Sequence, residues 1–280
     1  MKELVKIVIP IYNPELMPEE RFSLQQCFQI LSGYPKVIVK PSSLSVDKLA
    51  QEFPDVVFES FDDAYFKNIE GYNQLMLSPS FYERFLDSEY ILIYQLDAFV
   101  FRDELKEWAL KGYDYIGAPW IPRAKYSKPL LRLFCIVRDG VIKSFHIKEK
   151  RPYLRDIRYK VGNGGFSLRR VQTFFTVTTN EKETIASYSR PINESTLFTP
   201  EDVFWALEPA RKGYDFSVPD YKEAMFFSFD KYPEECFPIA KKIPFGCHAW
   251  NRRKEYEFWK NYIHPEYELK IEHEAEKPET

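Results

Sequence analysis

The sequence has few cysteines, and their spacing argues against two classes of protein. Its four cysteines are Cys27, Cys135, Cys236 and Cys247, which form no CxxC pair and lie in apolar surroundings. A structural zinc site or a disulfide framework shows closer or more regular cysteine spacing. We therefore expect neither, and we expect the protein to work in a reducing compartment.

Long hydrophobic runs are also missing. No segment approaches the roughly 20 apolar residues that a transmembrane helix needs. The strand-like sequence Leu4–Ile9 follows the first residues directly, without the apolar region of a cleavable signal. These features predict a cytoplasmic protein, or one that lies peripherally at the inner face of the membrane.

The chain also lacks a strong net charge. The formal net charge is −3, which gives no general attraction for nucleic acid. The charge is uneven, however: residues 121–160 hold twelve Lys and Arg against three acids, and residues 265–280 hold six acids against two lysines. The basic stretch contains no recognisable RNA or DNA module, so we predict no nucleic-acid partner.

These two charged regions set the expected domain limits. We interpret residues 121–160 as a basic insertion, whose apolar centre either packs on the body, the favoured alternative, or contacts an anionic membrane surface. The acidic tail 265–280 is expected to be solvated and disordered. No internal repeat or linker is visible, so residues 1–264 are predicted to form one domain.

The first half of the chain alternates short apolar segments with amphipathic ones. This rhythm predicts an α/β fold with a mostly parallel central sheet flanked by helices. The expected strands are Leu4–Ile9, Lys36–Lys40, Val56–Ser60, Tyr90–Gln95 and Tyr113–Ala118. The expected helices lie near Glu19–Leu31, Ser45–Phe53, Ile69–Phe85 and Glu104–Leu110. The 19 Tyr, 24 Phe and 5 Trp supply rings for a core and for clefts that suit flat or ring-shaped ligands.

The most informative segment is an apolar run that ends in a carboxylate, YILIYQLDAFVF at residues 90–101. A continuous run of this kind predicts a strand buried on both faces, where an unpaired acid costs several kcal/mol. Ligands of open α/β sheets bind outside the carboxyl ends of the strands. Asp97 is therefore a candidate ligand-binding or metal-binding residue; the alternative is that it caps the helix that opens near Asp103.

Three further motifs have both a structural and a functional interpretation. In VGNGGFSLR (161–169) the glycines permit either close approach to a bound group or a tight turn. In TPEDVFW (199–205) a capping Thr, a Pro at the first helical position and two acids suit a helix start, but an acid facing a cleft could also serve as a general base. In PFGCHAW (244–250) His248 is either simply hydrogen-bonded or a ligand.

Taken together, the motifs YQLDAFVF, DYIGAPW, GNGGFSLR, EDVFW and FGCHAW resemble those of a glycosyltransferase with the GT-A fold. They closely resemble a bacterial family of proteins assigned that activity, over about residues 4 to 250. The segment GYNQLMLS (71–78) is similar to the helix that precedes the metal motif in β-1,3-galactosyltransferase and Fringe-type enzymes. The segment IPIYN (9–13) is similar to the end of the first strand in many GT-A enzymes.

This resemblance implies a single-domain GT-A-like nucleotide-diphospho-sugar transferase fold and a hexosyltransferase-type activity. The enzyme would move a sugar, with inversion, from a UDP- or GDP-linked donor to a saccharide or glycolipid acceptor in cell-surface polysaccharide synthesis. The residues that the resemblance places at the nucleotide sugar are Pro10, Tyr12, Asn13, Gln95, Asp97, Asn163, Gly164, Gly165 and Trp250. Trp120 could also stack on a sugar face, or it could be packed in the interior instead.

The resemblance also implies the chemistry. Asp202 would be the base for the acceptor, with Glu201 orienting the acceptor or acting as the base instead. Asp97 and His248 would bind a divalent metal, Mn²⁺ or Mg²⁺, on the diphosphate. GT-A enzymes usually carry Asp-x-Asp, whereas this chain has Gln95 in the first position, and a neutral oxygen is a weaker ligand for a hard cation. Arg or Lys could neutralise the phosphates instead.

A second function class remains open. A catalytically inactive sugar- or nucleotide-binding protein could retain the GT-A fold. Gln95 favours this alternative, and the presence of Glu201, Asp202 and His248 favours the enzyme.

Overall fold

The computed structural model of the chain describes residues 2–122, 137, 152–190 and 198–264. Within these ranges no helix combines the length and the apolar character needed to cross a membrane. The tail 265–280 and most of the basic insertion 121–160 lie outside the described residues, so the predictions for them stay predictions.

Strands and helices alternate through the first half of the chain, as expected from the sequence. The elements of that half are β1 (Glu3–Pro10), α1 (Pro18–Ile30), β2 (Lys36–Pro41), α2 (Asp47–Glu52), β3 (Val57–Phe61), η1 (Asp63–Phe66), α3 (Ile69–Met76), α4 (Pro79–Glu83), β4 (Ser88–Tyr94), β5 (Phe99–Val100), α5 (Leu105–Leu110) and β6 (Tyr115–Ile116). The later elements are η3 (Pro152–Leu154), β7 (Phe166–Arg170), α7 (Val171–Asn180), α8 (Lys182–Tyr188), α9 (Glu201–Arg211), α10 (Tyr221–Phe227), β8 (Ser228–Phe229), α11 (Pro233–Ala240), β9 (Gly246–Cys247) and α12 (Arg253–Trp259).

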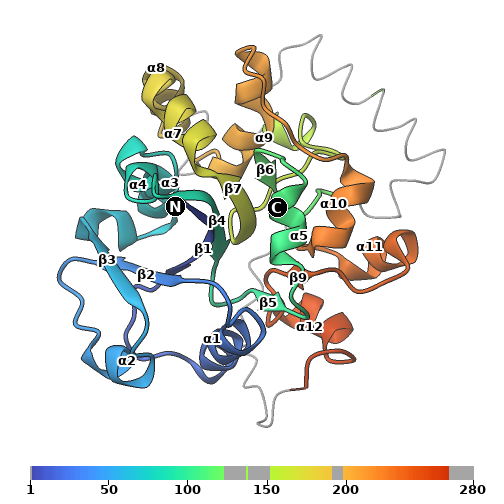
Figure 1. Ribbon diagram of the computed structural model, residues 1–280. Helices are drawn as coiled ribbons and strands as arrows, with labels where there is room; N and C mark the ends of the chain where they lie inside the picture. Colours follow the sequence, from blue (N-terminus) through green and yellow to red (C-terminus); the bar gives the residue numbers. More distant parts are fainter. Residues whose placement is uncertain (1, 123–136, 138–151, 191–197, 265–280) are drawn as a thin grey trace.

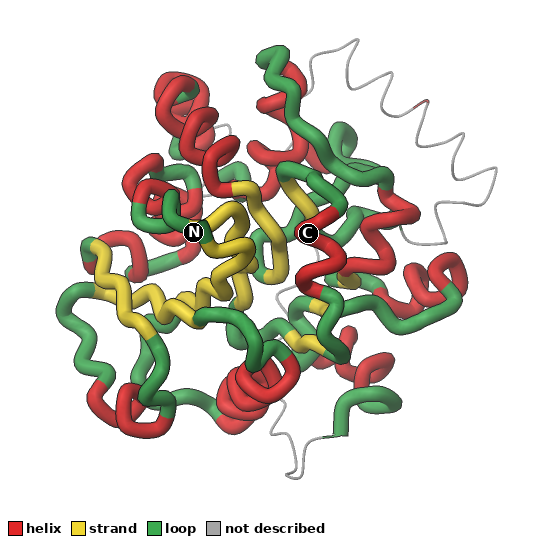
Figure 2. Tube along the Cα trace, viewed as in Figure 1, coloured by secondary structure: helices red, strands yellow, loops and turns green. Residues whose placement is uncertain are grey.

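The centre of the molecule is a six-stranded sheet with the order β3-β2-β1-β4-β7-β6 (Figures 1 and 2). Neighbours from β3 to β4 are parallel, while β7 runs antiparallel to both β4 and β6. The predicted α/β fold with a mostly parallel sheet is therefore confirmed.

Helices cover both faces of this sheet, which makes three layers. On β4, Tyr90, Leu92 and Tyr94 share a core with residues of α1, α2 and α5. Ile91 and Ile93 point to the other face and share a core with residues of α3, α4, α7 and α9. No residue from Tyr90 to Tyr94 is more than 1% exposed, as expected for a strand buried on both faces.

Two predicted helix boundaries are wrong by a small margin. The helix expected over 69–85 is two helices, because Pro79 lacks the N–H that would continue the first one and instead begins α4. The helix expected to carry Pro200 at its first position begins at Glu201, and Pro200 lies just before it as the N-cap residue. Both acids still occupy the first turn.

A second, three-stranded sheet has the order β5-β9-β8 and packs with α10, α11 and α12 around its own small core. Strands β8 and β9 are parallel, and Phe229 is in register with Cys247. The residues that follow these two strands therefore leave the sheet side by side.

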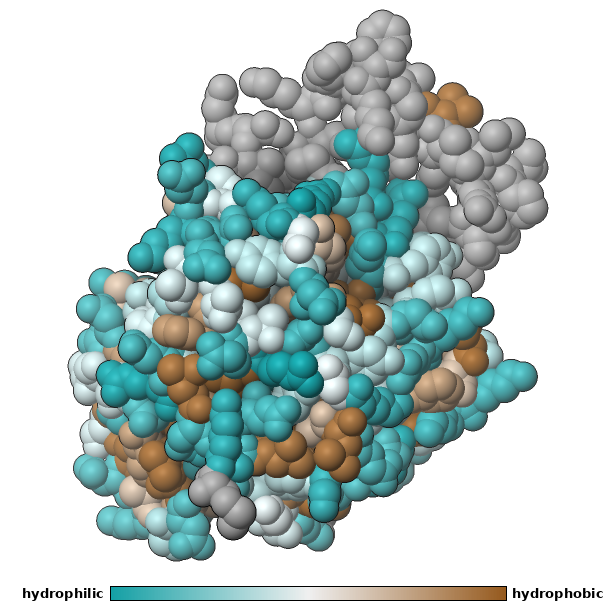
Figure 3. All heavy atoms as spheres, turned by 45° about the horizontal axis from the view of Figure 1, so that its top comes forward, coloured by the Kyte–Doolittle hydropathy of each residue, from teal (hydrophilic) through white to brown (hydrophobic). Residues whose placement is uncertain are grey.

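The outer surface is mixed in character on the face shown in Figure 3. Hydrophobic side chains gather there in small groups, with hydrophilic side chains between them. Such scattered apolar groups are ordinary for a surface in contact with water.

Candidate active site

Asp97 lies just beyond the end of β4 and contacts two basic side chains. Its Oδ1 is 3.0 Å from Nε2 of His248, and its Oδ2 is 3.4 Å from a guanidinium nitrogen of Arg252. The alternative that Asp97 caps α5 is wrong, because the N–H of Leu105 donates to Asp103. Asp97 is held by tertiary contacts and remains a candidate site residue.

His248 is the centre of this arrangement, with a polar partner on each ring nitrogen. Nε2 lies 3.0 Å from Asp97 Oδ1 and 3.1 Å from Oε1 of Gln95. Nδ1 lies 3.1 Å from Oδ1 of Asp230, the residue that follows β8. The structure thus brings together Gln95, Asp97 and His248 from the predicted site and adds Asp230.

The two carboxylates determine the charge of the ring. Burial lowers the pKa of His248, but the charge of Asp97 and the hydrogen bonds to Asp230 and Asp97 outweigh it and raise that pKa to about 10. Burial raises the pKa of Asp97, but the charge and hydrogen bond of His248, with the charge of Arg252, bring it down to about 2. At neutral pH His248 is an imidazolium between two carboxylates.

The residues fit a divalent cation by the chemistry of their donor atoms. A carboxylate oxygen of Asp97, the amide oxygen of Gln95 and Nε2 of His248 converge, and a carboxylate on the other ring nitrogen is the usual support of a metal-binding histidine. A cation bound by Nε2 would replace the proton there. No group of three or more His, Cys, Asp and Glu side chains within the described ranges is arranged as a metal site.

The adjacent acids at the start of α9 differ in their charged partners, although burial raises the pKa of both. Glu201 is 2% exposed, and its Oε1 accepts a 2.9 Å hydrogen bond from the guanidinium of Arg169. Asp202 pairs with no cation among the described residues, and its Oδ1, like Oε2 of Glu201, is buried without a hydrogen bond from any of them. Burial, then the charges of Glu201 and Asp230, raise the pKa of Asp202 to about 7. A carboxyl that titrates near neutral pH is suited to general-base catalysis.

Arg169 on β7 is completely buried and holds several parts of the site together. Besides Glu201, its guanidinium donates to the hydroxyl of Tyr82 at 2.9 Å and to Oγ of Ser167 at 3.0 Å. It also approaches the carbonyl oxygen of Gly164 at 3.4 Å. Glu201 is therefore positioned as a partner of Arg169, away from any bulk solvent.

The glycines of the GNGG motif are required by neighbouring side chains of the site. A Cβ on Gly164 would lie 2.1 Å from Oε1 of Glu201, and a Cβ on Gly165 would lie 2.1 Å from Nε2 of His248. Asn163 has φ of 80° and its Oδ1 accepts from the N–H of Gly165 at 2.7 Å. The motif is thus a turn whose backbone touches the candidate catalytic groups.

The predicted nucleoside-binding residues at the end of β1 and just after it differ in exposure. Pro10 is buried in the sheet opposite Val39. Tyr12 is 66% exposed, and the pKa of its hydroxyl is raised by partial burial and then by the charges of Glu20 and Asp97. Asn13 accepts through Oδ1 from a backbone N–H two residues later. Their role in binding a nucleoside stays a prediction.

The two tryptophans considered for sugar stacking are occupied by protein contacts. Trp250 is 0% exposed and its ring meets Phe22 and Phe99 edge-on, so it has no open face for a ligand. The half-buried Trp120 lies over Gly162, where a Cβ would come within 1.8 Å of its ring.

Sequence reasoning missed Asp230, Arg169 and Arg252. A signal for Asp230 was present, because the segment FFSFD (226–230) is an apolar run that ends in a carboxylate, the pattern that pointed to Asp97. Arg169 and Arg252 carry no such local signal, since their roles come from contacts with residues far away in the sequence.

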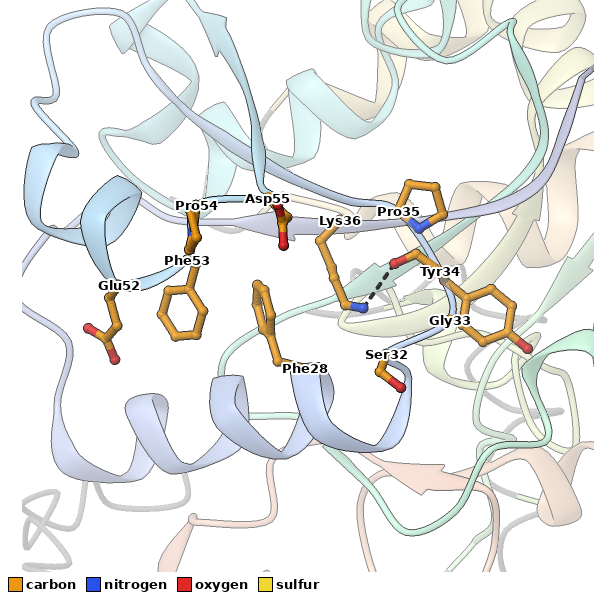
Figure 4. A pocket seen from close by; sticks show the side chains of 10 residues that line it. All are labelled: Phe28, Ser32, Gly33, Tyr34, Pro35, Lys36, Glu52, Phe53, Pro54 and Asp55. Carbon is orange, nitrogen blue, oxygen red and sulfur yellow. Dashed lines mark hydrogen bonds between the residues drawn. The ribbon is translucent and has the colours of Figure 1, made fainter.

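A surface cavity of about 530 Å³ lies elsewhere, at the amino end of β2 (Figure 4). Lys36 extends into it and donates to the carbonyl oxygens of Leu31 and Tyr34 at 2.6 and 2.9 Å, just past the end of α1. A cation that caps the last carbonyls of a helix is a sufficient structural role. This cavity lies at the amino end of β2, whereas Asp97 follows the carboxyl end of β4, so the cavity takes no part in the candidate site.

Comparison with known families gives a clear assignment. Residues 55–248 match the family described as "Protein of unknown function (DUF5672)". The chain belongs to the DUF5672 family. The matched range of this DUF5672 protein includes Gln95, Asp97, Asp202, Asp230 and His248, whereas β1 and β2 precede it. No curated protein is similar enough in sequence to count as a relative of this DUF5672 chain.

Solved structures show what the DUF5672 fold resembles. The galactosyltransferase LgtC, solved with donor and acceptor sugar analogues, gives a TM-score of 0.50 at 12% identity over 93% of this chain and 98% of its own. Mouse xyloside xylosyltransferase 1 gives 0.51 at 10% identity over 87% and 97%. The bifunctional glycosyltransferase WbbM gives 0.50 at 15% identity; the match covers 97% of the DUF5672 chain but only 51% of WbbM. The DUF5672 chain therefore has a GT-A-like fold.

Proposed function

We propose that the protein is a glycosyltransferase that moves a sugar from a nucleotide-diphospho-sugar donor to a saccharide or glycoconjugate acceptor. One observation carries the proposal: a single carboxylate, Asp230, hydrogen-bonds to His248, and its charge adds to burial and the charge of Glu201 in raising the pKa of Asp202. His248, a cation suited to a leaving diphosphate, and Asp202, a carboxyl suited to take a proton, thus both interact with Asp230. The GT-A-like fold supports this interpretation.

One part of the site would act on the leaving diphosphate, and the other part would act on the acceptor hydroxyl. Displacement at the anomeric carbon releases a nucleoside diphosphate, whose growing charge needs positive partners. His248 and Arg252 supply positive charge beside Asp97. Asp202 would take the proton from the acceptor hydroxyl, while Glu201, paired with Arg169, would support the helix that carries it.

A divalent cation, Mn²⁺ or Mg²⁺, belongs to the proposal because the donor set fits it. Asp97, Gln95 and His248 would hold it, and it would supply positive charge against the diphosphate in place of the proton on Nε2. With one carboxylate and two neutral donors, this set binds hard cations more weakly than a pair of carboxylates does.

The finer features of the proposal rest on the resemblance of the sequence motifs. They are a UDP- or GDP-linked donor, a saccharide or glycolipid acceptor, an inverting hexosyl transfer and a role in bacterial cell-surface polysaccharide synthesis. A cytoplasmic location with peripheral membrane contact through the insertion 121–160 completes this proposal.

A second candidate is a binding protein without catalytic activity. It is favoured by Gln95 in the position where GT-A enzymes usually carry an acid and by the fact that His248 and Arg252 already neutralise Asp97. Asp202, with its raised pKa and unpaired oxygen, argues for the enzyme.

A screen for hydrolysis of UDP- and GDP-sugars, with and without Mn²⁺, separates the two candidates. Transferases slowly transfer their donor to water, so no acceptor has to be known. The enzyme predicts turnover that Asp202→Asn reduces strongly, whereas the binding protein predicts a raised melting temperature with UDP or GDP and no turnover. If no nucleotide stabilises the protein at millimolar concentration, the transferase and the nucleotide-binding alternative both fail.

A further inference from the structure

The position of Asp230 follows from the register of the second sheet. Strands β8 and β9 are parallel, with Phe229 opposite Cys247, and the N–H of His248 donates to the carbonyl oxygen of Phe229 at 2.9 Å. Asp230 and His248 are the next residues on their strands. Both side chains therefore leave the same edge of the sheet, with 13% and 12% of their surface exposed.

This register brings one ring nitrogen of His248 to a carboxyl group. Nδ1 of the ring lies 3.1 Å from Oδ1 of Asp230, which is hydrogen-bond distance. A carboxylate oxygen accepts hydrogen bonds, so in this arrangement Nδ1–H of His248 donates to Asp230. Turning the ring over would lose this bond and carry Nδ1 toward Asp97.

We infer that Asp230 is a positioning residue that holds the imidazole of His248 so that Nε2 faces Gln95 and Asp97. The inference rests on the proposed function, because it assigns Asp230 to the diphosphate side of that site. Asp230 itself lies behind the ring and acts through His248. On the other side of the ring, Nε2 lies 3.0 Å from Oδ1 of Asp97 and 3.1 Å from Oε1 of Gln95, and Gly165 is so close that a Cβ there would meet Nε2.

The test uses the full chain and two substitutions. Asp230→Ala removes the acceptor, while Asp230→Asn keeps an oxygen in the same place without the charge. Asp156→Asn is the matched control, because Asp156 is a half-exposed acid paired with Arg211 on the surface. Only four histidines are present, so the Nδ1–H of His248 can be assigned by NMR from the signal missing in His248→Ala. The probes for binding are UDP and GDP with Mn²⁺, measured by calorimetry.

The wild-type protein and Asp156→Asn should show a downfield Nδ1–H signal and equal nucleotide affinity. Asp230→Ala should lose the signal and about 10- to 100-fold in affinity, the usual effect of removing a carboxylate that orients a functional histidine. Asp230→Asn should keep the signal, shifted upfield because a neutral acceptor bonds more weakly, and recover most of the affinity. A merely structural role would not predict this recovery.

Two results would overturn the inference. One is an unchanged His248 signal in Asp230→Ala; the other is a loss of affinity no larger than that of Asp156→Asn. Should Asp230→Ala fail to fold, an Asp230→Asn protein without the Nδ1–H signal overturns the inference equally. If UDP and GDP do not bind the wild type, the donor part of the proposed function fails, and the NMR signal alone decides the role of Asp230.

Discussion

At the scale of single residues, two neighbouring acids of α9 have different surroundings and therefore different expected roles. Glu201 is paired with Arg169, whereas Asp202 pairs with no cation among the described residues and has a pKa raised to about 7. We predict that Asp202→Asn lowers the rate of sugar transfer or donor hydrolysis by about two to four orders of magnitude and leaves donor affinity unchanged. Kinetics and calorimetry on the same preparation measure both. A large rate loss in a stable Glu201→Gln protein, with a small one in Asp202→Asn, would reverse the assignment.

The buried pair Arg169–Glu201 should show strong coupling in stability. Removing either partner leaves a buried charge without compensation, which costs about 3–5 kcal/mol of unfolding free energy. We therefore expect Arg169→Met and Glu201→Gln each to destabilise strongly, and the double variant to lose much less than their sum. Urea unfolding of the four proteins gives the coupling energy. Additive losses would mean that the pair contributes no mutual stabilisation.

The ionisation of Asp202 should lower the free energy of unfolding near pH 7, where Asp202 would act as a base. Its folded-state pKa is about 7, against about 4 for an unfolded chain, so the folded protein keeps a proton that the unfolded chain loses between these values. Stability due to this group is complete below about pH 4, falls as the pH rises to about 7, and stays reduced above. Asp202→Asn should therefore raise the melting temperature at about pH 8 and change it little at about pH 4. A pH-independent difference would contradict the raised pKa.

At the scale of elements, the GNGG turn is the part of the site with the least free space. A Cβ on Gly165 would meet Nε2 of His248 at 2.1 Å, so Gly165→Ala should displace the imidazole and weaken nucleotide binding. The matched control is Gly33→Ala in a surface turn, where a Cβ would meet nothing within 4 Å. The control should bind like wild type and be as stable or slightly more stable. Calorimetry and thermal unfolding of both variants test this, and equal binding by Gly165→Ala would mean that His248 does not contact the nucleotide.

The same scale shows how much the sequence could predict. The strand β4 was predictable because five successive apolar residues leave no alternative to burial on both faces. The parallel pairing of the first strands was predictable from their alternation with helices, whereas the order β3-β2-β1-β4 was not. The site was predictable only where a local motif marks it, as at Asp97 and His248. Arg169 could not be identified, because a basic residue in a strand looks exposed until its partners on α4 and α9 are known.

At the scale of the whole molecule, the matched family range is smaller than the folding unit. Residues 55–248 leave out β1, which lies between β2 and β4 at the centre of the sheet. A chain of residues 55–248 would expose one edge of β4 and much of both cores. We expect it to be insoluble or unfolded by circular dichroism, while residues 1–264 unfold cooperatively. A cooperative transition in the shorter chain would show that β1 is dispensable.

The central place of β1 also sets the order in which a growing chain can fold. β1 can pair with β2 early, but its other edge waits for β4, because Val8 is in register with Ile93. A parallel pairing of such distant segments forms slowly, and an open edge can meanwhile join another chain. His248 and its neighbours on β9 are made later still. The proposed nucleotide binding would therefore require nearly the whole described chain to be in place, and a nucleotide in the refolding medium should favour the correctly folded product over aggregates.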